Sequence, residues 1–477
     1  MTVKSPNILF INTDQLRADF LGAYGFPAET SPNIDRLARG GIRFERAFTQ
    51  CTICVPARYS LTTGLYVSNH GAISNNHATY PTARSLLEAF NANGYKTVCI
   101  GKLHHNPPDL KFGFREVYLH DGGFPERRLY SIYSRWLADE GVDENELWYP
   151  VGIDDVPEKR RLKDRLHWGR CRLPEKHCES TFLSNFAVDY VKKYPKDKPI
   201  FLYLSYVAPH SPYCPPAPYD EMFDPAKMPA PRRETDQELA RKHPAIRLTG
   251  ERFGPKGIPD QTMREVRAQY AGMIRHLDDQ IGRAVAAFRE TFGKNVLIAL
   301  TSDHGDFLGE HYKCEKHWMY EAAVQVPFIL NWPGKIPADT MTKALVEQID
   351  MFPTVLGLAG AKWDQTHVAG RDLSRGIMTG RVKTAKFVFS ENRDNIGPTA
   401  AYMAMLRSAH YKLIAVLSED PAAPIFWEFY DLEKDPGELD NLINRPKYKK
   451  LIEEHRRAFF EKLLQIKRYD PPARGQS

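Results

Sequence analysis

Short runs of apolar residues alternate along the chain with segments of helical periodicity. Runs of five to seven residues, bounded by turn-forming residues, occur at 8–12, 97–101, 201–207 and 295–301. Runs of this length and composition are typical of strands buried on both faces. Helical patterns lie between them, at 31–38, where Pro32 stands in the first turn, and at 83–90. This alternation predicts an α/β fold with a large, mostly parallel mixed sheet flanked by helices.

The pattern changes from about residue 380 onward. Short strand-like runs at 387–390 and 411–416 are followed by an amphipathic helical pattern at 447–466. A chain of 477 residues is also too long for one ordinary core. We therefore expect a catalytic domain over residues 1–379 and a smaller C-terminal α+β domain over residues 380–477.

Polar residues follow each of the four long apolar runs. Asp14, Lys102, His210 and Asp303 stand shortly after the predicted strands. In an open α/β sheet, ligands bind beyond the carboxyl ends of the strands. One geometric rule satisfied by four separate segments predicts a shared site at that edge.

Composition and charge narrow the partners rather than the fold. The net charge is +6, spread over the chain, which gives no reason to expect nucleic acid. No apolar run is long enough to span a bilayer, and no signal-peptide pattern precedes the first strand, so we expect a cytoplasmic protein. The seven cysteines have no regular spacing and predict no disulfide framework.

Two motifs together offer ligands for a divalent metal. Asp14 and Gln15 follow the first predicted strand, and Asp303 and His304 follow the last of the four. Two carboxylates, an amide and an imidazole that converge on one point suit a divalent cation. The alternative is that each Asp only caps a helix.

The sequence C-V-P-A-R at residues 54–58, followed closely by L-T-T-G, carries the most specific chemical signal. It resembles the C-x-P-x-R signature of type I sulfatases of the alkaline phosphatase superfamily. The resemblance implies that a formylglycine-generating enzyme converts Cys54 to formylglycine, whose hydrate is the nucleophile. It also implies that Arg58 braces this group and that residue 54 joins the metal ligands. The competing interpretation is a redox or metal pair of Cys51 and Cys54, which lacks a second ligand pair.

Three further segments resemble the same family, in the same order. G-K-L-H at residues 101–104 implies that Lys102 neutralises the sulfate and that His104 takes a proton during its release. A-P-H-S-P-Y at residues 208–213 implies that His210 faces the ester oxygen of the leaving group. Lys316 resembles the second sulfate-binding lysine of the family.

Some residues depart from the usual sulfatase pattern. Gln15 and His304 resemble the metal ligands of phosphonate monoester hydrolases, and Asn75 resembles a residue that contacts the transferred group there. Calcium is the favoured metal because most ligands are oxygens, whereas the imidazole of His304 makes manganese the alternative.

The sequence thus predicts an arylsulfatase-like sulfuric ester hydrolase that acts on a small anionic sulfate ester, and it allows for a homo-oligomer. The alternative within hydrolases is a phosphonate monoester or phosphodiester hydrolase. The alternative from another class is a non-catalytic metal- or anion-binding protein. Such a protein would lack one or more of the candidate catalytic residues, yet all of them are present.

Overall fold

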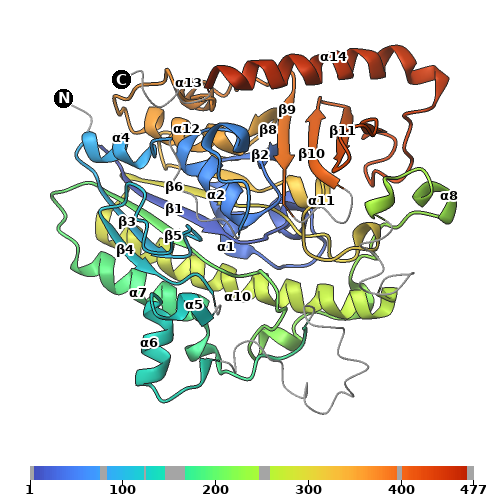
Figure 1. Ribbon diagram of the computed structural model, residues 1–477. Coiled ribbons are helices and arrows are strands. Elements are labelled where there is room, and N and C mark those ends of the chain that lie inside the picture. Colours follow the sequence, from blue (N-terminus) through green and yellow to red (C-terminus); the bar gives the residue numbers. More distant parts are fainter. Residues whose placement is uncertain are drawn as a thin grey trace.

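An eight-stranded sheet forms the centre of the protein in the computed structural model, which describes residues 5–75, 83–122, 125–144, 167–246, 258–394 and 400–469 (Figure 1). Its strand order is β4-β3-β5-β1-β6-β7-β2-β8. Neighbouring strands are parallel except where β7 pairs with β6 and β2. The strands are β1 (Asn7–Thr13), β2 (Ile42–Phe48), β3 (Lys96–Gly101), β4 (Glu116–Leu119), β5 (Ile200–Ser205), β6 (Val296–Ser302), β7 (Phe328–Asn331) and β8 (Thr340–Glu347).

Helices cover both faces of this sheet. Along β1, Leu9 and Ile11 point into one core, whereas Ile8 and Phe10 point into the other. The first core is closed by α1 (Pro32–Arg39), α7 (Glu179–Lys193) and α10 (Asp260–Phe292). The second is closed by α2 (Cys54–Thr63), α4 (Leu87–Ala92), α12 (Met351–Leu358) and α13 (Ser374–Met378). Burial on both faces explains why the strands read as continuous apolar runs.

The C-terminal part contains a second, antiparallel sheet of order β12-β11-β10-β9. Its strands are β9 (Val388–Asn392), β10 (Ala400–Arg407), β11 (Tyr411–Ser418) and β12 (Phe426–Asp431), and α14 (Lys449–Ile466) packs across them. The predicted fold class is therefore confirmed. The boundary at residue 380 falls between α13 and β9, and the division into two domains stays a prediction, because Tyr66 and Ile349 share a hydrophobic cluster with Phe389.

One predicted helix begins later than its pattern indicated. Residues 83–90 were expected to be helical, but α4 begins at Leu87. The Leu87 amide donates to Ser85 Oγ at 3.3 Å, a local bond that competes with helical hydrogen bonding.

The remaining α-helices of the described residues are α3 (Val67–His70), α5 (Pro125–Arg128), α6 (Ile132–Asp139), α8 (Asp236–Leu239) and α11 (Glu321–Val324).

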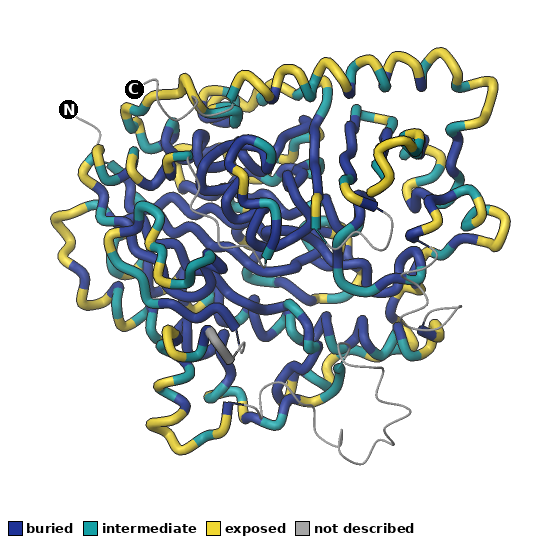
Figure 2. The backbone as a smooth tube through the Cα atoms, viewed as in Figure 1, coloured by how far each residue is buried: buried dark blue, intermediate teal, exposed yellow. Residues whose placement is uncertain are grey.

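Burial follows this layered arrangement. The central strands β1, β5 and β6 are buried throughout, whereas the outer face of α14 is exposed (Figure 2). Among the described residues, no helix combines the length and the apolar character needed to cross a bilayer. The consequence for chemistry is that β3, β5, β1 and β6, four adjacent parallel strands, end side by side in a buried environment.

Candidate functional site

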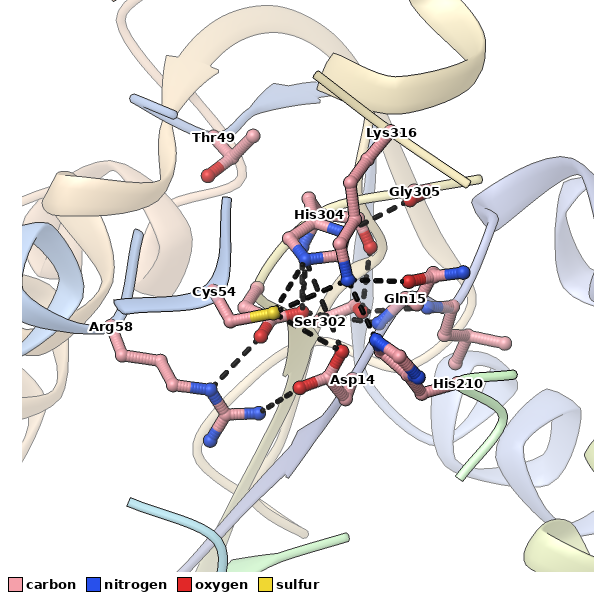
Figure 3. Close-up of polar contacts among 12 residues, drawn as sticks. Asp14, Gln15, Thr49, Cys54, Arg58, His210, Ser302, His304, Gly305 and Lys316 are labelled. Atoms are coloured by element: carbon pink, nitrogen blue, oxygen red, sulfur yellow. Dashed lines mark hydrogen bonds and ion pairs between the residues drawn. The ribbon is translucent and has the colours of Figure 1, made fainter. Parts of the chain in front are cut away.

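The carboxyl ends of these four strands position the predicted residues. Asp14 directly follows β1, Lys102 follows β3 and Asp303 follows β6, whereas His210 lies in the loop after β5. Cys54, Arg58, His304 and Lys316 reach the same place from α2 and from the loops after β6 (Figure 3). The side chains of Asp14, Cys54, Arg58, His210 and Lys316 therefore lie together, and their roles stay predictions.

Cys54 is the first residue of α2 and is buried at its N-terminus. Its Sγ lies 3.2 Å from His304 Nε2, 3.4 Å from Lys316 Nζ and 3.7 Å from Asp14 Oδ1. This sulfur stands where an oxygen of a formylglycine side chain would lie. A helix N-terminus favours negative charge, so its position suits an anionic nucleophile and an anionic ester.

Four side chains around Cys54 can hold a metal ion. One ligand atom from each of Asp14, Cys54, Asp303 and His304 lies within 4.8 Å of the others, and all four residues are buried. Atoms bound to a common ion at about 2.0–2.6 Å are necessarily within about 4–5 Å of each other. The donor set therefore fits a divalent cation.

The hydrogen bonds of His304 support this fit. Its Nδ1 lies 2.9 Å from the Gly305 carbonyl oxygen, which can only accept, so Nδ1 carries the proton. The Nε2 lone pair then faces the cluster, the usual arrangement of a metal-binding histidine. Burial lowers the pKa of His304, so the imidazole is neutral.

Arg58 and Lys102 provide positive charge beside the carboxylates of Asp14 and Asp303, at the Oδ2 atoms. The Arg58 guanidinium donates to Asp303 Oδ2 at 2.9 Å and to Asp14 Oδ2 at 3.1 Å. Lys102 Nζ lies 2.6 Å from Asp14 Oδ2. Burial alone would raise the pKa of Asp14, but the positive charges of Lys102, Arg58 and Lys316 hold it well below its usual range. The buried Asp14 carboxylate can thus stay ionised.

Gln15 is bonded to Lys316 and to Asp306, of which the sequence identified only Lys316. Its Oε1 accepts from Lys316 Nζ at 2.7 Å, and its Nε2 donates to Asp306 Oδ2 at 2.6 Å. Tyr213 also donates to Asp306 Oδ2, at 2.5 Å. These contacts fix the orientation of the amide, and metal ligation by Gln15 stays a prediction. Tyr213 ends the A-P-H-S-P-Y motif and Asp306 stands three residues after Asp303, and only these positions could have pointed to them.

Lys316 and His210 form a pair beside the nucleophile. Lys316 Nζ lies 2.7 Å from His210 Nε2, and His210 Nδ1 lies 2.7 Å from the Ser211 carbonyl oxygen. His210 therefore donates through Nδ1 and accepts from the lysine through Nε2. Burial would lower the pKa of Lys316, but Cys54 and Asp14 raise it above its ordinary value. The lysine is a charged donor within reach of Cys54.

Two predicted residues occupy positions next to this cluster. His104 is buried, and its amide donates to Asp121 Oδ1 at 2.8 Å. Asn75 Oδ1 accepts from the Val55 amide at 2.9 Å, in the first turn of α2. Asn75 therefore supports the helix that carries Cys54, and a direct contact of Asn75 with substrate stays a prediction.

A larger cavity, of about 260 Å³, lies away from this cluster, between Arg17, Arg407 and Glu438. Several charged groups of its wall form ion pairs with one another, as Arg407 does with Glu321 at 3.1 Å and Arg17 with Glu310 at 3.4 Å. The candidate metal ligands and the Lys316–His210 pair lie around Cys54 instead. This buried cluster, and not the cavity, is therefore the candidate active site.

Comparison with known proteins agrees with this geometry. Residues 6–361 match the family model described as Sulfatase, and residues 309–465 match that of the N-sulphoglucosamine sulphohydrolase C-terminal region. The chain is 28% identical to an arylsulfatase of Clostridium perfringens, over 96% of this chain and 94% of that protein. It is 30% identical to the multifunctional alkaline phosphatase superfamily protein PehA of Trinickia caryophylli, over 94% and 93%. The phosphonate monoester hydrolase SpPMH of Silicibacter pomeroyi superimposes with a TM-score of 0.81 at 27% identity, covering 96% and 95%.

Proposed function

The chain belongs to the sulfatase family of the alkaline phosphatase superfamily, and from that membership we propose that it hydrolyses sulfate monoesters with S–O cleavage. The observation that carries the proposal is the position of Cys54 Sγ, 3.4 Å from Lys316 Nζ and 3.2 Å from His304 Nε2. A nucleophile at residue 54 has metal ligands on one side and a cationic donor on the other.

Formylglycine at residue 54 would supply, as its hydrate, one hydroxyl to attack sulfur and a second whose deprotonation expels sulfate. A thiol lacks that second hydroxyl and cannot complete this cycle. His104, in the loop after β3, is the residue proposed to take the second proton. Its buried imidazole has a pKa well below the ordinary value, because burial and the nearby Lys102 disfavour the charged form. It is thus neutral before it accepts a proton.

Asp14, Asp303 and His304 would hold the divalent ion together with residue 54, and the ion would lower the energy of negative charge on the nucleophile and ester oxygens. Arg58 keeps both carboxylates turned toward the cluster by bonding their other oxygens. Calcium is proposed first, and manganese is the alternative because His304 contributes nitrogen.

Lys316 and His210 are proposed to act on the leaving group. Lys316 carries a proton at Nζ and shares it with His210 Nε2 at 2.7 Å. An ester oxygen seated between them would gain a proton or a hydrogen bond as the S–O bond breaks. General acid catalysis of this kind contributes typically about 10²–10⁴-fold.

The second candidate function is hydrolysis of phosphonate monoesters or phosphodiesters. Gln15 and His304 favour it, as do the similarities to PehA and to the phosphonate monoester hydrolase SpPMH. We place the sulfatase first because Lys102 and His104 match sulfatases at the step that releases sulfate. We further propose that the protein is cytoplasmic, that it can form a homo-oligomer and that a formylglycine-generating enzyme converts Cys54.

The deciding experiment compares kcat/KM for a sulfate, a phosphonate and a phosphodiester that carry the same aryl leaving group. Sulfate should be preferred, and Lys102→Ala should lower its turnover by about 10²–10³-fold, because a charge-stabilising group is lost. Lys434→Ala, at an exposed lysine, is the control. If a phosphorus ester is preferred by more than about tenfold, or if Lys102→Ala has no effect on sulfate turnover, the second function replaces the first.

A further inference from the structure

A cavity of about 50 Å³ adjoins His210. Its walls come from the loop after β5, from the start of α7 and from the middle of α10. Residues that border it include Cys178, Val207, His210, Pro212, Cys214 and Met273. The loop after β5 is also tied to the segment before α7, because the Cys171 amide donates to the Pro215 carbonyl oxygen at 2.9 Å.

The wall of this cavity offers mainly carbon and sulfur atoms. Glu179 borders it, but its Oε1 accepts from the Ala208 amide at 3.1 Å and its Oε2 lies 3.0 Å from His120 Nε2. His276 also borders it, with Nε2 bonded to Thr181 Oγ1 at 3.0 Å. The prolines carry no N–H donor. The polar groups of Glu179 and His276 are thus engaged elsewhere, Ser180 adds one hydroxyl, and the rest of the wall favours an apolar group.

His210 links the cavity to the nucleophile. Its Nε2 lies 2.7 Å from Lys316 Nζ, which in turn lies 3.4 Å from Cys54 Sγ. In the proposed reaction His210 faces the ester oxygen of the leaving group. The carbon that bears this oxygen must then lie beside His210, next to the cavity.

The volume limits what can enter. A cavity of about 150 Å³ lined by apolar side chains holds benzene. About one third of that volume, 50 Å³, accommodates a group of one or two carbons but not a ring.

We infer that this cavity is a specificity pocket for a compact apolar branch on the alcohol part of the ester, next to the ester oxygen. This inference rests on the proposed function, because it takes His210 as the residue that faces the leaving group. It predicts a preference for esters of small branched secondary alcohols over esters that lack the branch or carry a ring there. A methyl group in a matching apolar pocket changes kcat/KM by about 10–200-fold.

The test measures kcat/KM for ethyl, propan-2-yl and cyclohexyl sulfate with the formylglycine-containing protein. The propan-2-yl ester should be preferred over both others by about tenfold or more. Cys214→Leu, which fills the cavity, should abolish the preference for propan-2-yl over ethyl. Met273→Ala, which enlarges the cavity, should shift the preference toward cyclohexyl. Met222→Ala, at a methionine that is 45% exposed, should leave the ratios as in the wild type.

The same three alcohols are also tested as phosphonate monoesters. If phosphonates are the better substrates but show the same order among the alcohols, the sulfatase proposal fails and the pocket stands. If the ratios among the alcohols are flat in the wild type, or unchanged in both Cys214→Leu and Met273→Ala, the pocket is overturned whichever ester class is hydrolysed.

Discussion

Asp14 uses its two carboxylate oxygens in different directions. Oδ2 bonds to Lys102 and Arg58, whereas Oδ1 faces Cys54 and His304. Asp303 divides its oxygens in the same way, with Oδ2 on Arg58 and Oδ1 accepting backbone amides. A buried carboxylate can remain charged only when its charge is matched in this manner. The sequence identified both residues from their positions after strands, but it could not show how each oxygen is used.

Asp303→Ala should remove the bound metal. The substitution deletes one ligand of the cluster and leaves Arg58 without the acceptor that it contacts at 2.9 Å. Metal analysis of the purified protein should fall from about one ion per chain to a small fraction of that. Asp364→Ala, at an exposed carboxylate, serves as the control. Undiminished metal content in Asp303→Ala would place the ion elsewhere.

At the scale of elements, the segment 308–317, which carries Lys316, has an unusual backbone conformation. Five of its non-glycine residues have positive φ angles: Leu308 (44°), His311 (54°), Tyr312 (60°), Glu315 (64°) and His317 (94°). Each such residue costs of order 1–3 kcal/mol unless the surroundings determine its conformation. This segment must therefore be held in place by contacts with other parts of the protein.

Glu310 provides a large part of that restraint. Its Oε1 accepts from Arg267 at 2.8 Å, and its Oε2 accepts from the Arg232 amide at 2.6 Å. Burial would raise the pKa of Glu310, but Arg17 and Arg267 lower it, so the carboxylate is charged. These partners are distant in the sequence, which explains why no local pattern predicted the path of this segment.

The packing of α2 against α3 gives the protein a pH dependence at acid pH. His70 Nδ1 accepts from the Ala72 amide, so its Nε2 carries the proton and donates to Ser60 Oγ at 2.9 Å. Burial lowers the pKa of His70 to about 3. The unfolded chain binds this proton below about pH 6.5, whereas the folded protein does so only near pH 3, so acidification between these values favours unfolding.

His70→Gln should therefore flatten the acid dependence of stability. The free energy of unfolding of the wild type should lose up to about 1.4 kcal/mol per pH unit through this group, and the variant should lack that contribution. Denaturant unfolding between pH 7 and pH 4 measures the slope. His367→Gln, at an exposed histidine, should keep the wild-type slope. An unchanged slope in His70→Gln would contradict the assignment.

At the scale of the whole molecule, Lys412 connects the C-terminal sheet to the active-site segment. Its Nζ lies 2.8 Å from Glu321 Oε1 and 2.7 Å from Glu438 Oε1, and it donates to the Met319 carbonyl oxygen at 3.0 Å. Lys412 lies on β11, and Met319 is close in sequence to Lys316. The small sheet is thus joined by ion pairs and a hydrogen bond to the segment next to Lys316.

Lys412→Met should lower both stability and activity. The substitution leaves Glu438 without its cationic partner, whereas Glu321 keeps Arg407 at 3.1 Å. Breaking a buried ion pair by removing one partner costs about 3–5 kcal/mol. The midpoint of urea unfolding and the kcat/KM of the folded protein should both decrease. Lys450→Met, at an exposed lysine, is the control. Wild-type kcat/KM in a destabilised Lys412→Met protein would show that the connection serves stability alone.

The parts of the molecule that were predictable have local signatures. The strands before Asp14, Lys102 and Asp303 are continuous apolar runs, and parallel order then brings their ends together. The support of α2 by Asn75 and the ion pairs of Lys412 depend on contacts between distant segments. Such contacts follow from the assembled fold and leave no periodicity in the sequence.

The burial of Cys54 limits when its side chain can be modified. Its side chain is only 1% exposed, and every residue of α2 is buried. In the proposed maturation, the formylglycine-generating enzyme needs an accessible peptide, so we expect it to act on the newly made chain before residue 54 is buried. Adding that enzyme to the folded, cysteine-containing protein should not restore activity, whereas producing the two together should give active protein. Protein produced without the formylglycine-generating enzyme should therefore fold correctly but remain inactive.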